Sequence, residues 1–320
     1  MTIPEQFESP DFQKLRETSQ TFYLFGEHIS KSKAPLLHNT TFQSVGLNNW
    51  EYKLYEGSDF QNFNEKFSNE NLIGSAITMP NKVEGIKNVD FLDSIGKGCG
   101  SINTIYTKID PQNNKKVKVG TNTDTVGIKE SFLQNYPKET EILSKSPGLI
   151  YGGGGACRSA VFALYNLLKV PKIYIINRFA EEVEQVKQSM ISNGFKGEII
   201  HVSTPEQAKT LELPKLVVLT VPNFPPTTKE EIQARSTLDV FLKQDEPGIV
   251  LEMCYHPIIE TTLYNDFLNS NWKVISGVEA MIYQGIAQQI LWTGFSIDEI
   301  PTKRIIESLY KTIKEESKSI

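Results

Sequence analysis

Apolar and polar positions follow different patterns in the two halves of the chain, and the second half gives the clearer one. From residue 147 onward, short apolar runs recur with amphipathic, helical stretches such as SAVFALYNLL and AEEVEQVKQSM between them. Continuous apolar runs such as LVVLTV are typical of strands that are covered on both faces. The second half is therefore predicted to be a parallel α/β sheet. Its expected strands are GLIYG, KIYIIN, GEIIHV, KLVVLTV, GIVLEMCY and WKVISG.

The first half predicts a mixed sheet. KKVKVG is expected to pair antiparallel with SINTIYT, because the turn-forming residues DPQNN separate them. The segment after these strands, DTVGIKESFLQNYPKETEILSKSP, is expected to be a helix followed by a polar loop. From residue 277 the pattern is helical to the end, and Pro301 is well placed to open the last helix. The other strands expected in this half are FYLF, WEYKLY and LIGSAI.

Composition and charge exclude several classes of partner. The chain has 320 residues, of which 39% are hydrophobic, and its formal net charge of -5 comes from interspersed Lys and Glu. Neither a nucleic-acid surface nor a polybasic membrane patch is indicated, so a small-molecule partner is expected. No apolar run approaches the ~18 residues that span a bilayer, and the start of the chain has no leader pattern. We expect a cytoplasmic protein that is a monomer or a homodimer.

Cysteines and histidines give no sign of a metal site. The three cysteines have no metal-type spacing, and their low, odd number argues against a disulfide scaffold. The histidines share neither a metal spacing nor a nucleophile-base-acid arrangement. His38 fits a helical pattern and is interpreted as a structural, hydrogen-bonding residue. The four histidines are His28, His38, His201 and His256.

A glycine-rich loop provides the first chemical signal. LIYGGGGACRSAVFALYNL has Gly152 and Gly154 at the first two positions of G-x-G-x-x-G, and the small Cys157 at the third. Such a loop turns tightly, lets the backbone approach a pyrophosphate and offers a helix N-terminus to the anion. A glycine-rich surface turn is the alternative. The order of strand, loop, helix and strand favours dinucleotide binding.

The residues after the next strand bear on which dinucleotide is bound. KIYIIN ends at Asn177 and Arg178, where an NAD site would offer an acidic residue to the ribose hydroxyls. Arg178 is suited to pair with a 2′-phosphate and to stack on adenine, so NADP is predicted, with NAD as the alternative. The other interpretation is that Arg178 is a solvated loop arginine and that Glu181 or Glu182 contributes.

One lysine and one aspartate suggest acid-base chemistry. Lys82 lies just past an apolar strand in LIGSAITMPNKVEG, and Asp124 follows a strand in GTNTDTVG, where the two halves join. Enzymes of the α/β class bind ligands at the carboxyl ends of strands, in the crevice between domains. A lysine and an aspartate that face each other there pass a proton to and from a carbonyl while a nicotinamide exchanges hydride. The alternatives are a solvated surface lysine and an Asn/Asp turn.

Several short motifs, taken in order, resemble those of the shikimate/quinate 5-dehydrogenase family. FGEHISKSKAPLLHNTTF is similar to the family's G-x-x-x-x-x-S-x-S-P-x-x-H-N, and GSAITMPNK to its G-x-N-V-T-x-P-x-K. GSINTI, GTNTDTVG, YGGGGACRSA, EMCYHPIIETTL and GVEAMIYQG also resemble family motifs. The resemblance spans roughly residues 22 to 295, and this many motifs in the family's order are specific even where each is short.

This resemblance implies an α/β fold of two domains and a role for each. Residues 1–124 and 278–320 are expected to form a discontinuous substrate domain with a mixed sheet, and residues 125–277 a Rossmann-type NAD(P)-binding domain. The implied reaction is reversible hydride transfer between NAD(P) and a shikimate- or quinate-like cyclic hydroxy acid, with no metal. Lys82 and Asp124 would be the acid/base pair, and Ser32 would bind the substrate carboxylate. The other implied substrate residues are Thr78, Asn103, Tyr255 and Gln284, and the implied cofactor residues are Gly152, Gly154, Gly155, Ala156, Asn177 and Arg178.

The chain departs from the family pattern at positions that concern the substrate. The family's second serine is Ala34, the Asn of G-x-N-V-T is Ala76, and the Asp before the cleft tyrosine is Glu252. Loss of one hydroxyl donor to a carboxylate weakens the binding free energy of the acid by about 1.5–3 kcal/mol. The chemistry is expected to be intact while substrate recognition has drifted. The alternatives are a weak or inactive member that acts as a sensor or regulator, and a dehydrogenase with a divergent substrate.

Overall fold

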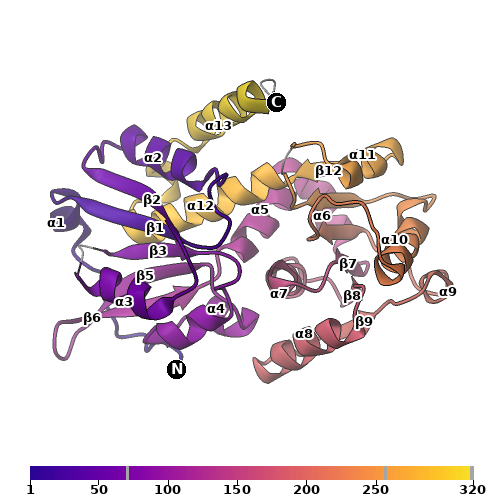
Figure 1. The fold of residues 1–320 in the computed structure, drawn as a ribbon, viewed down its shortest axis with the longest axis horizontal. Coiled ribbons are helices and arrows are strands. Elements are labelled where there is room, and N and C mark those ends of the chain that lie inside the picture. The colour runs from indigo at the N-terminus through magenta and orange to yellow at the C-terminus, as the bar shows by residue number, and fades with distance from the viewer. Residues whose placement is uncertain (70–71, 256–257, 318–320) are drawn as a thin grey trace. The chain divides into compact units, whose positions relative to one another are not determined.

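The computed structural model describes residues 1–69, 72–255 and 258–317. The chain divides into two compact units (Figure 1), which we call unit 1, Met1–Thr123 with Gln284–Ile320, and unit 2, Asp124–Tyr283. The family resemblance implies that the domain changes after residues 124 and 277, whereas the chain passes from one unit to the other after residues 123 and 283. The role given to each unit stays a prediction.

Unit 1 contains a mixed six-stranded sheet. β1 pairs parallel with β2 and β3, while β5 pairs antiparallel with β3 and β6, and β4 pairs parallel with β6. The hairpin of β5 and β6 confirms the antiparallel pair predicted across DPQNN. In sheet order the strands are β2 (Trp50–Glu56), β1 (Gln20–Gly26), β3 (Gly74–Ile77), β5 (Thr104–Asp110), β6 (Lys115–Thr121) and β4 (Phe91–Leu92).

Strand β1 shows how both faces of this sheet are buried. Its neighbouring residues Phe22 and Tyr23 belong to different hydrophobic clusters, one with Trp292 and the other with Phe63. Successive residues of a strand point to opposite faces, so the two clusters lie on opposite sides of the sheet. The Trp292 ring centroid lies 4.9 Å from that of Phe22. A helix from the C-terminal part of the chain therefore completes the core of unit 1.

The helices of unit 1 come from both ends of the sequence. α2 and α13 lie side by side (Figure 1), and α12 runs from unit 2 into unit 1 without a break. The structure thus places the two predicted C-terminal helices. The helices are α1 (Phe12–Arg16), α2 (Ala34–Ser44), α3 (Phe60–Asn69), η1 (Glu84–Asn88), α4 (Ser94–Cys99), α12 (Gly277–Thr293), η3 (Ile297–Glu299) and α13 (Thr302–Ser317).

Unit 2 contains a six-stranded sheet in which every pairing is parallel. Every residue of β7, β10 and β11 is buried, as the continuous apolar runs predict. From β7 the chain order runs outward through β8 and β9, and on the other side from β10 through β11 and β12. In sheet order the strands are β12 (Lys273–Ser276), β11 (Ile249–Glu252), β10 (Leu216–Leu219), β7 (Gly148–Tyr151), β8 (Lys172–Ile176) and β9 (Glu198–His201).

One predicted loop in unit 2 is wrong. After α5 the chain forms a second helix, α6, which Pro137 opens and whose buried Thr140 bonds to the carbonyl of Phe132. Its short, mostly polar sequence hides the helical period. The helices are α5 (Asp124–Asn135), α6 (Pro137–Leu143), α7 (Gly155–Phe162), η2 (Ala163–Leu167), α8 (Ala180–Ser192), α9 (Pro205–Ala208), α10 (Lys229–Leu242) and α11 (Thr262–Asn269). In the part of the chain that the structure describes, no helix has the length and apolar character to cross a membrane.

Candidate functional sites

The glycine loop follows the central strand β7 of unit 2. Gly152 has a φ of +114°, which side-chain-bearing residues rarely adopt, and a Cβ there would lie 2.6 Å from Thr220 Oγ1. The Gly152 N–H donates to the carbonyl of Ile176 at the end of β8, and the Thr220 hydroxyl donates to the carbonyl of Tyr151. The loop is thus fixed between the ends of β8 and β10, where the strand order reverses. Ligands of doubly wound sheets bind at this reversal.

Beyond the turn, the loop leaves room for an anion. A Cβ added at Gly154 or Gly155 would meet no other heavy atom within 4 Å. Helix α7 begins at Gly155 and has no side chain capping its first turn, and Ala156 follows in that turn. The first N–H groups and the dipole of such a helix attract a negative charge. The loop therefore fits a pyrophosphate.

Cys157 continues this helix and does no redox chemistry in our interpretation. Its side chain is buried, and burial raises the pKa of its thiol to about 12. A thiol with so high a pKa is neutral and inert at physiological pH. Its small size suits the packing of α7 on the sheet, as the sequence predicts.

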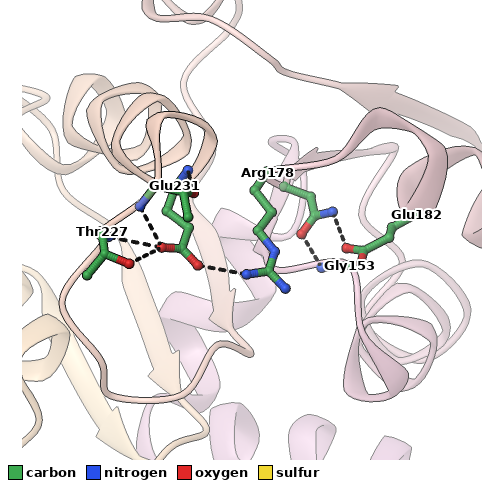
Figure 2. Close-up of polar contacts among 7 residues, drawn as sticks. Gly153, Arg178, Glu182, Thr227 and Glu231 are labelled. Atoms are coloured by element: carbon green, nitrogen blue, oxygen red, sulfur yellow. Dashed lines mark hydrogen bonds and ion pairs between the residues drawn. The ribbon is translucent and has the colours of Figure 1, made fainter.

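Asn177 ties the end of β8 to the glycine loop. Its Oδ1 accepts a hydrogen bond from the N–H of Gly153 at 2.9 Å, and its Nδ2 donates to Glu182 Oε2 at 2.6 Å (Figure 2). Nδ2 also donates to the carbonyl of Phe179. A Cβ at position 153 would lie 2.8 Å from Asn177 Nδ2, so any other residue there would displace the Asn177 side chain. Asn177 and the loop form one hydrogen-bonded structure.

Arg178 is paired with a glutamate that the sequence analysis missed. Its Nη1 donates to Glu231 Oε1 at 2.7 Å (Figure 2), and its guanidinium carbon lies 5.0 Å from the centroid of the Phe179 ring. Glu231 Oε2 also accepts from the N–H groups of Thr227 and Thr228. These hydrogen bonds, with the one from Arg178, lower the pKa of Glu231 to about 2. The available signal was the capping-box sequence TKEE, which places this glutamate at a helix N-terminus.

A buried polar cluster lies in unit 1 at the ends of β5 and β6. Asn103 Oδ1 accepts from the N–H of Thr123 and from the hydroxyl of Thr104, both at 2.7 Å. Asn103 Nδ2 donates to Gln284 Oε1 at 3.2 Å. Asn103, Thr104 and Thr123 are each 3% exposed or less. The structure therefore brings together Asn103 and Gln284, two of the residues predicted to contact substrate.

Helix α12 adds a second glutamine to this cluster. Gln288 is one turn after Gln284, so the two side chains lie on one face of the helix. Its Nε2 donates to Thr104 Oγ1 at 2.8 Å. The sequence analysis singled out Gln284 alone, although the spacing of four residues in QGIAQ was visible. Thr104 and Thr123 gave no comparable signal.

Ser32 lies just before helix α2. Its Oγ accepts a hydrogen bond from the N–H of Ala34 at 3.2 Å, so its own O–H is the group it offers to a ligand. Ala34, where the family has a second serine, is buried and packs in the hydrophobic cluster with Phe42. Where the family has a hydroxyl, this chain therefore has a methyl group that packs in a hydrophobic cluster.

Thr78 and Lys82 lie on the turn after β3. The Thr78 N–H donates to the carbonyl of Phe25, and the Lys82 carbonyl accepts from the N–H of Ile102 at 2.8 Å. Between them the buried Asn81 side chain donates to the carbonyl of Gly57. These bonds fix the backbone of Lys82 beside the residue that precedes Asn103.

Asp124 opens helix α5 in unit 2, where its charge favours the helix N-terminus. In the same unit, burial first, and then the charges of Cys254 and Asp124, raise the pKa of Tyr255 to about 12. Near Tyr255, the carboxyl of the buried Glu252 accepts from the Cys254 N–H at 2.8 Å. Burial raises the pKa of Glu252 to about 8.

The position of His38 fits the structural role that the sequence predicts for it. His38 is buried, its ring Nδ1 lies 2.8 Å from Gln289 Nε2, and burial lowers its pKa to about 3. The interpretation of His38 as a structural residue is confirmed. His256 lies outside the described residues. Across the ranges that the structure describes, no group of three or more His, Cys, Asp or Glu side chains is placed to hold a metal.

The parallel sheet of unit 2, with a glycine loop at its reversal point, defines a protein of the Rossmann-fold class. Residues 24–105 match the model of the shikimate dehydrogenase substrate binding domain. The quinate dehydrogenase of Emericella nidulans is 39% identical in an alignment 314 residues long, which covers 93% of this chain and 95% of that protein. The chain therefore belongs to the quinate/shikimate dehydrogenase family, and it is an oxidoreductase.

Solved structures agree with this fold. Dehydroquinate dehydratase and shikimate dehydrogenase from S. pombe AroM has a TM-score of 0.73 and 27% identity, over 91% of this chain and 53% of that chain. Quinate dehydrogenase from Corynebacterium glutamicum, in complex with NAD, has a TM-score of 0.75 and 18% identity, over 92% of this chain and 99% of that chain. The two-domain α/β fold with a Rossmann-type domain is thereby confirmed.

Proposed function

We propose that the protein transfers hydride reversibly between a nicotinamide dinucleotide and the ring carbon of a shikimate- or quinate-like cyclic hydroxy acid. Lys82 and Asp124 act as the acid/base pair. The observation that carries this proposal is the hydrogen bond from the Thr123 N–H to Asn103. Asp124 is the next residue after Thr123, and the Lys82 carbonyl is bonded to Ile102, the residue before Asn103. One hydrogen-bonded cluster thus links the backbones that carry both groups.

The proposed step is an alcohol oxidation or its reverse. When bound, the dinucleotide accepts or supplies the hydride at the ring carbon. In the oxidation, the Lys82–Asp124 pair takes the proton of the ring hydroxyl, and in the reduction it returns a proton to the ketone oxygen. Proton transfer by a placed side chain contributes about 10²–10⁴-fold to rate. Asp124 also orients the lysine in this proposal.

The remaining predicted residues hold the substrate. The Ser32 hydroxyl donates to the ring carboxylate, and Thr78, Asn103 and Gln284 contact the ring hydroxyls, while Tyr255 lines the site. Apolar contact at Ala34 replaces one donor to the carboxylate. The name of the E. nidulans relative supports quinate as the first substrate to test.

The glycine loop and the residues after β8 hold the dinucleotide in this proposal. Gly152, Gly154, Gly155 and Ala156 receive the pyrophosphate, and Asn177 fixes the loop. Solved neighbours are in complex with NAD in one case and with NADP+ in another. The sequence predicts NADP from Arg178, but the ion pair of Arg178 with Glu231 supports NAD.

A cofactor-by-substrate matrix tests the proposal. Purified protein is mixed with NAD+ or NADP+ and with quinate or shikimate, and the absorbance of the reduced dinucleotide is followed. We expect turnover of at least one acid. Tight binding of both ligands by calorimetry without turnover of either acid would instead support the sensor or regulator that the sequence left open.

A further inference from the structure

The side chain of Arg178 is already engaged by a carboxylate. It leaves the end of β8 and extends to the N-terminus of α10, where Nη1 meets Glu231 Oε1 at 2.7 Å (Figure 2). The two side chains are 46% and 26% exposed, so the pair lies at the surface of unit 2 within reach of a ligand. A phosphate that used Arg178 would have to compete with Glu231.

Glu231 is held in place by its own helix. It is the third residue of α10 and forms a capping box with Thr228, whose hydroxyl accepts from the Glu231 N–H. Its Oε2 accepts from the N–H groups of Thr227 and Thr228 at 2.9 and 3.1 Å. One carboxylate oxygen therefore caps the helix while the other faces Arg178. Because the helix fixes Glu231, the ion pair needs little further ordering of this side chain, unlike most exposed pairs.

A second carboxylate lies on the other side of the same turn. Glu182 accepts from Asn177 Nδ2 at 2.6 Å, and Asn177 is the residue before Arg178 (Figure 2). In dinucleotide-binding folds, the end of this strand meets the adenosine ribose. The ribose region is thus flanked by one paired arginine and two carboxylates. Carboxylates accept hydrogen bonds from ribose hydroxyls, whereas a 2′-phosphate of about -1.5 to -2 charges is repelled.

We propose that Glu231 determines dinucleotide specificity by holding Arg178 in the ion pair, and that the site therefore selects NAD over NADP. The inference rests on the proposed dinucleotide binding and adds a positioning residue to it. It reverses the preference that Arg178 alone predicts, because a guanidinium paired with a fixed carboxylate has lost the net charge that would attract a phosphate.

The test compares wild type with Glu231→Gln. Glutamine keeps an oxygen that caps α10 but removes the negative charge that holds Arg178. The measured quantity is the NADP+ to NAD+ ratio of kcat/KM, together with the Kd of NADPH and NADH by fluorescence titration. We expect wild type to favour NAD and the variant to raise the ratio by on the order of tenfold, the effect of one charge-assisted hydrogen bond.

Two further variants isolate the mechanism. Glu230→Gln makes the same change of charge at the exposed neighbouring residue and should leave the ratio within about twofold of wild type. Arg178→Gln combined with Glu231→Gln should cancel most of the gain, because the freed arginine is what binds the phosphate. A purely structural role for Glu231 would weaken both dinucleotides together and leave the ratio unchanged.

The outcomes separate this inference from the proposed function. A wild type that prefers NADP, or a ratio that Glu231→Gln does not change, overturns the inference while turnover of quinate or shikimate keeps the function. Selective binding of NADH that Glu231→Gln relaxes, without turnover of either acid, supports the inference and overturns the proposed reaction. Failure of both dinucleotides to bind overturns both.

Discussion

Asn103 Oδ1 accepts a hydrogen bond of 2.7 Å from the backbone N–H of Thr123. The bond joins the residue before β5 to a residue just after β6, and the next residue in the chain is Asp124. Removing the acceptor of a buried N–H lowers the free energy of unfolding, because the donor is left without a partner and without water. This single carboxamide therefore stabilises the segment that leads to the proposed acid/base aspartate.

Replacing Asn103 by Ala should lower the free energy of unfolding by about 2–3 kcal/mol, since it takes the acceptor from the Thr123 N–H and one of the donors from Gln284 Oε1. Denaturant unfolding measures the change. Gln112→Ala, in the exposed turn between β5 and β6, is the control and should shift stability by less than about 0.5 kcal/mol. Equal stability of N103A and wild type would contradict a restraining role for the cluster.

Lys82→Ala and Asp124→Asn should each lower kcat by about 10²–10⁴-fold, because proton transfer to and from the ring oxygen loses its group. Steady-state rates with the better acid of the matrix measure this loss. Lys87→Ala removes a nearby exposed lysine, paired with Glu84 at 2.8 Å, and should keep the wild-type rate. Retention of full activity in K82A would remove Lys82 from the mechanism.

Gly153→Ala and Gly154→Ala should differ in stability but agree in binding. A Cβ at residue 153 meets Asn177 at 2.8 Å, so G153A should unfold with a free energy lower by about 1–3 kcal/mol. A Cβ at residue 154 meets nothing within 4 Å, so G154A should fold as wild type does. Both should weaken the binding of NADH in a fluorescence titration: G154A because its methyl group enters the space offered to the pyrophosphate, and G153A because its methyl group displaces Asn177, which holds the loop. Normal binding by G154A would count against that location.

Ala34→Ser restores the second hydroxyl of the family pattern. The KM for the ring acid should fall up to about tenfold if this position faces the carboxylate, which is the effect of one charge-assisted hydrogen bond. Kinetics with quinate and shikimate compare the two acids. An unchanged KM for both acids would show that Ala34 does not account for substrate choice.

Glu252→Gln should change how stability depends on pH. Burial holds the pKa of Glu252 at about 8 in the folded protein, against 4.5 for an ordinary glutamate. As pH rises from about 4.5 to 8, the unfolded chain loses this proton first, so the wild type loses stability over that range. E252Q has no such proton and keeps the hydrogen bond from Cys254. Denaturant unfolding at pH 5 and pH 8 measures the difference in free energy of unfolding between E252Q and wild type. From pH 5 to pH 8 this difference should change in favour of the variant by on the order of 1–4 kcal/mol. The same pH dependence of stability in both proteins would contradict the raised pKa.

Much of the fold is predictable because its signals are local. The apolar runs of unit 2 are strands covered on both faces, and the turn residues DPQNN separate β5 from β6, so periodicity and turn chemistry were enough. Helix α6 was not predicted, because a short helix that Pro137 opens and one buried threonine anchors has no apolar period to detect.

The candidate sites were predictable only in part. Short motifs draw attention to Gly152, Asn103 and Asn177. Gly152 has a positive φ, and the two asparagine side chains accept hydrogen bonds from the backbone of other segments. The ion pair of Arg178 with Glu231 joins residues 53 positions apart, and no property of either residue alone indicates its partner. Long-range pairing of charges depends on the strand order of the finished sheet.

The split of unit 1 between both ends of the sequence has a consequence for synthesis on the ribosome. Its core is closed by the buried Trp292 of α12, which is made after the 160 residues of unit 2. At ~5–20 residues per second, the nascent sheet of unit 1 waits about 8 to 30 seconds for that tryptophan. During this time only residues of the first 123, such as Phe42, pack on that face of the sheet, so the apolar surface that Trp292 later buries stays exposed to chaperones.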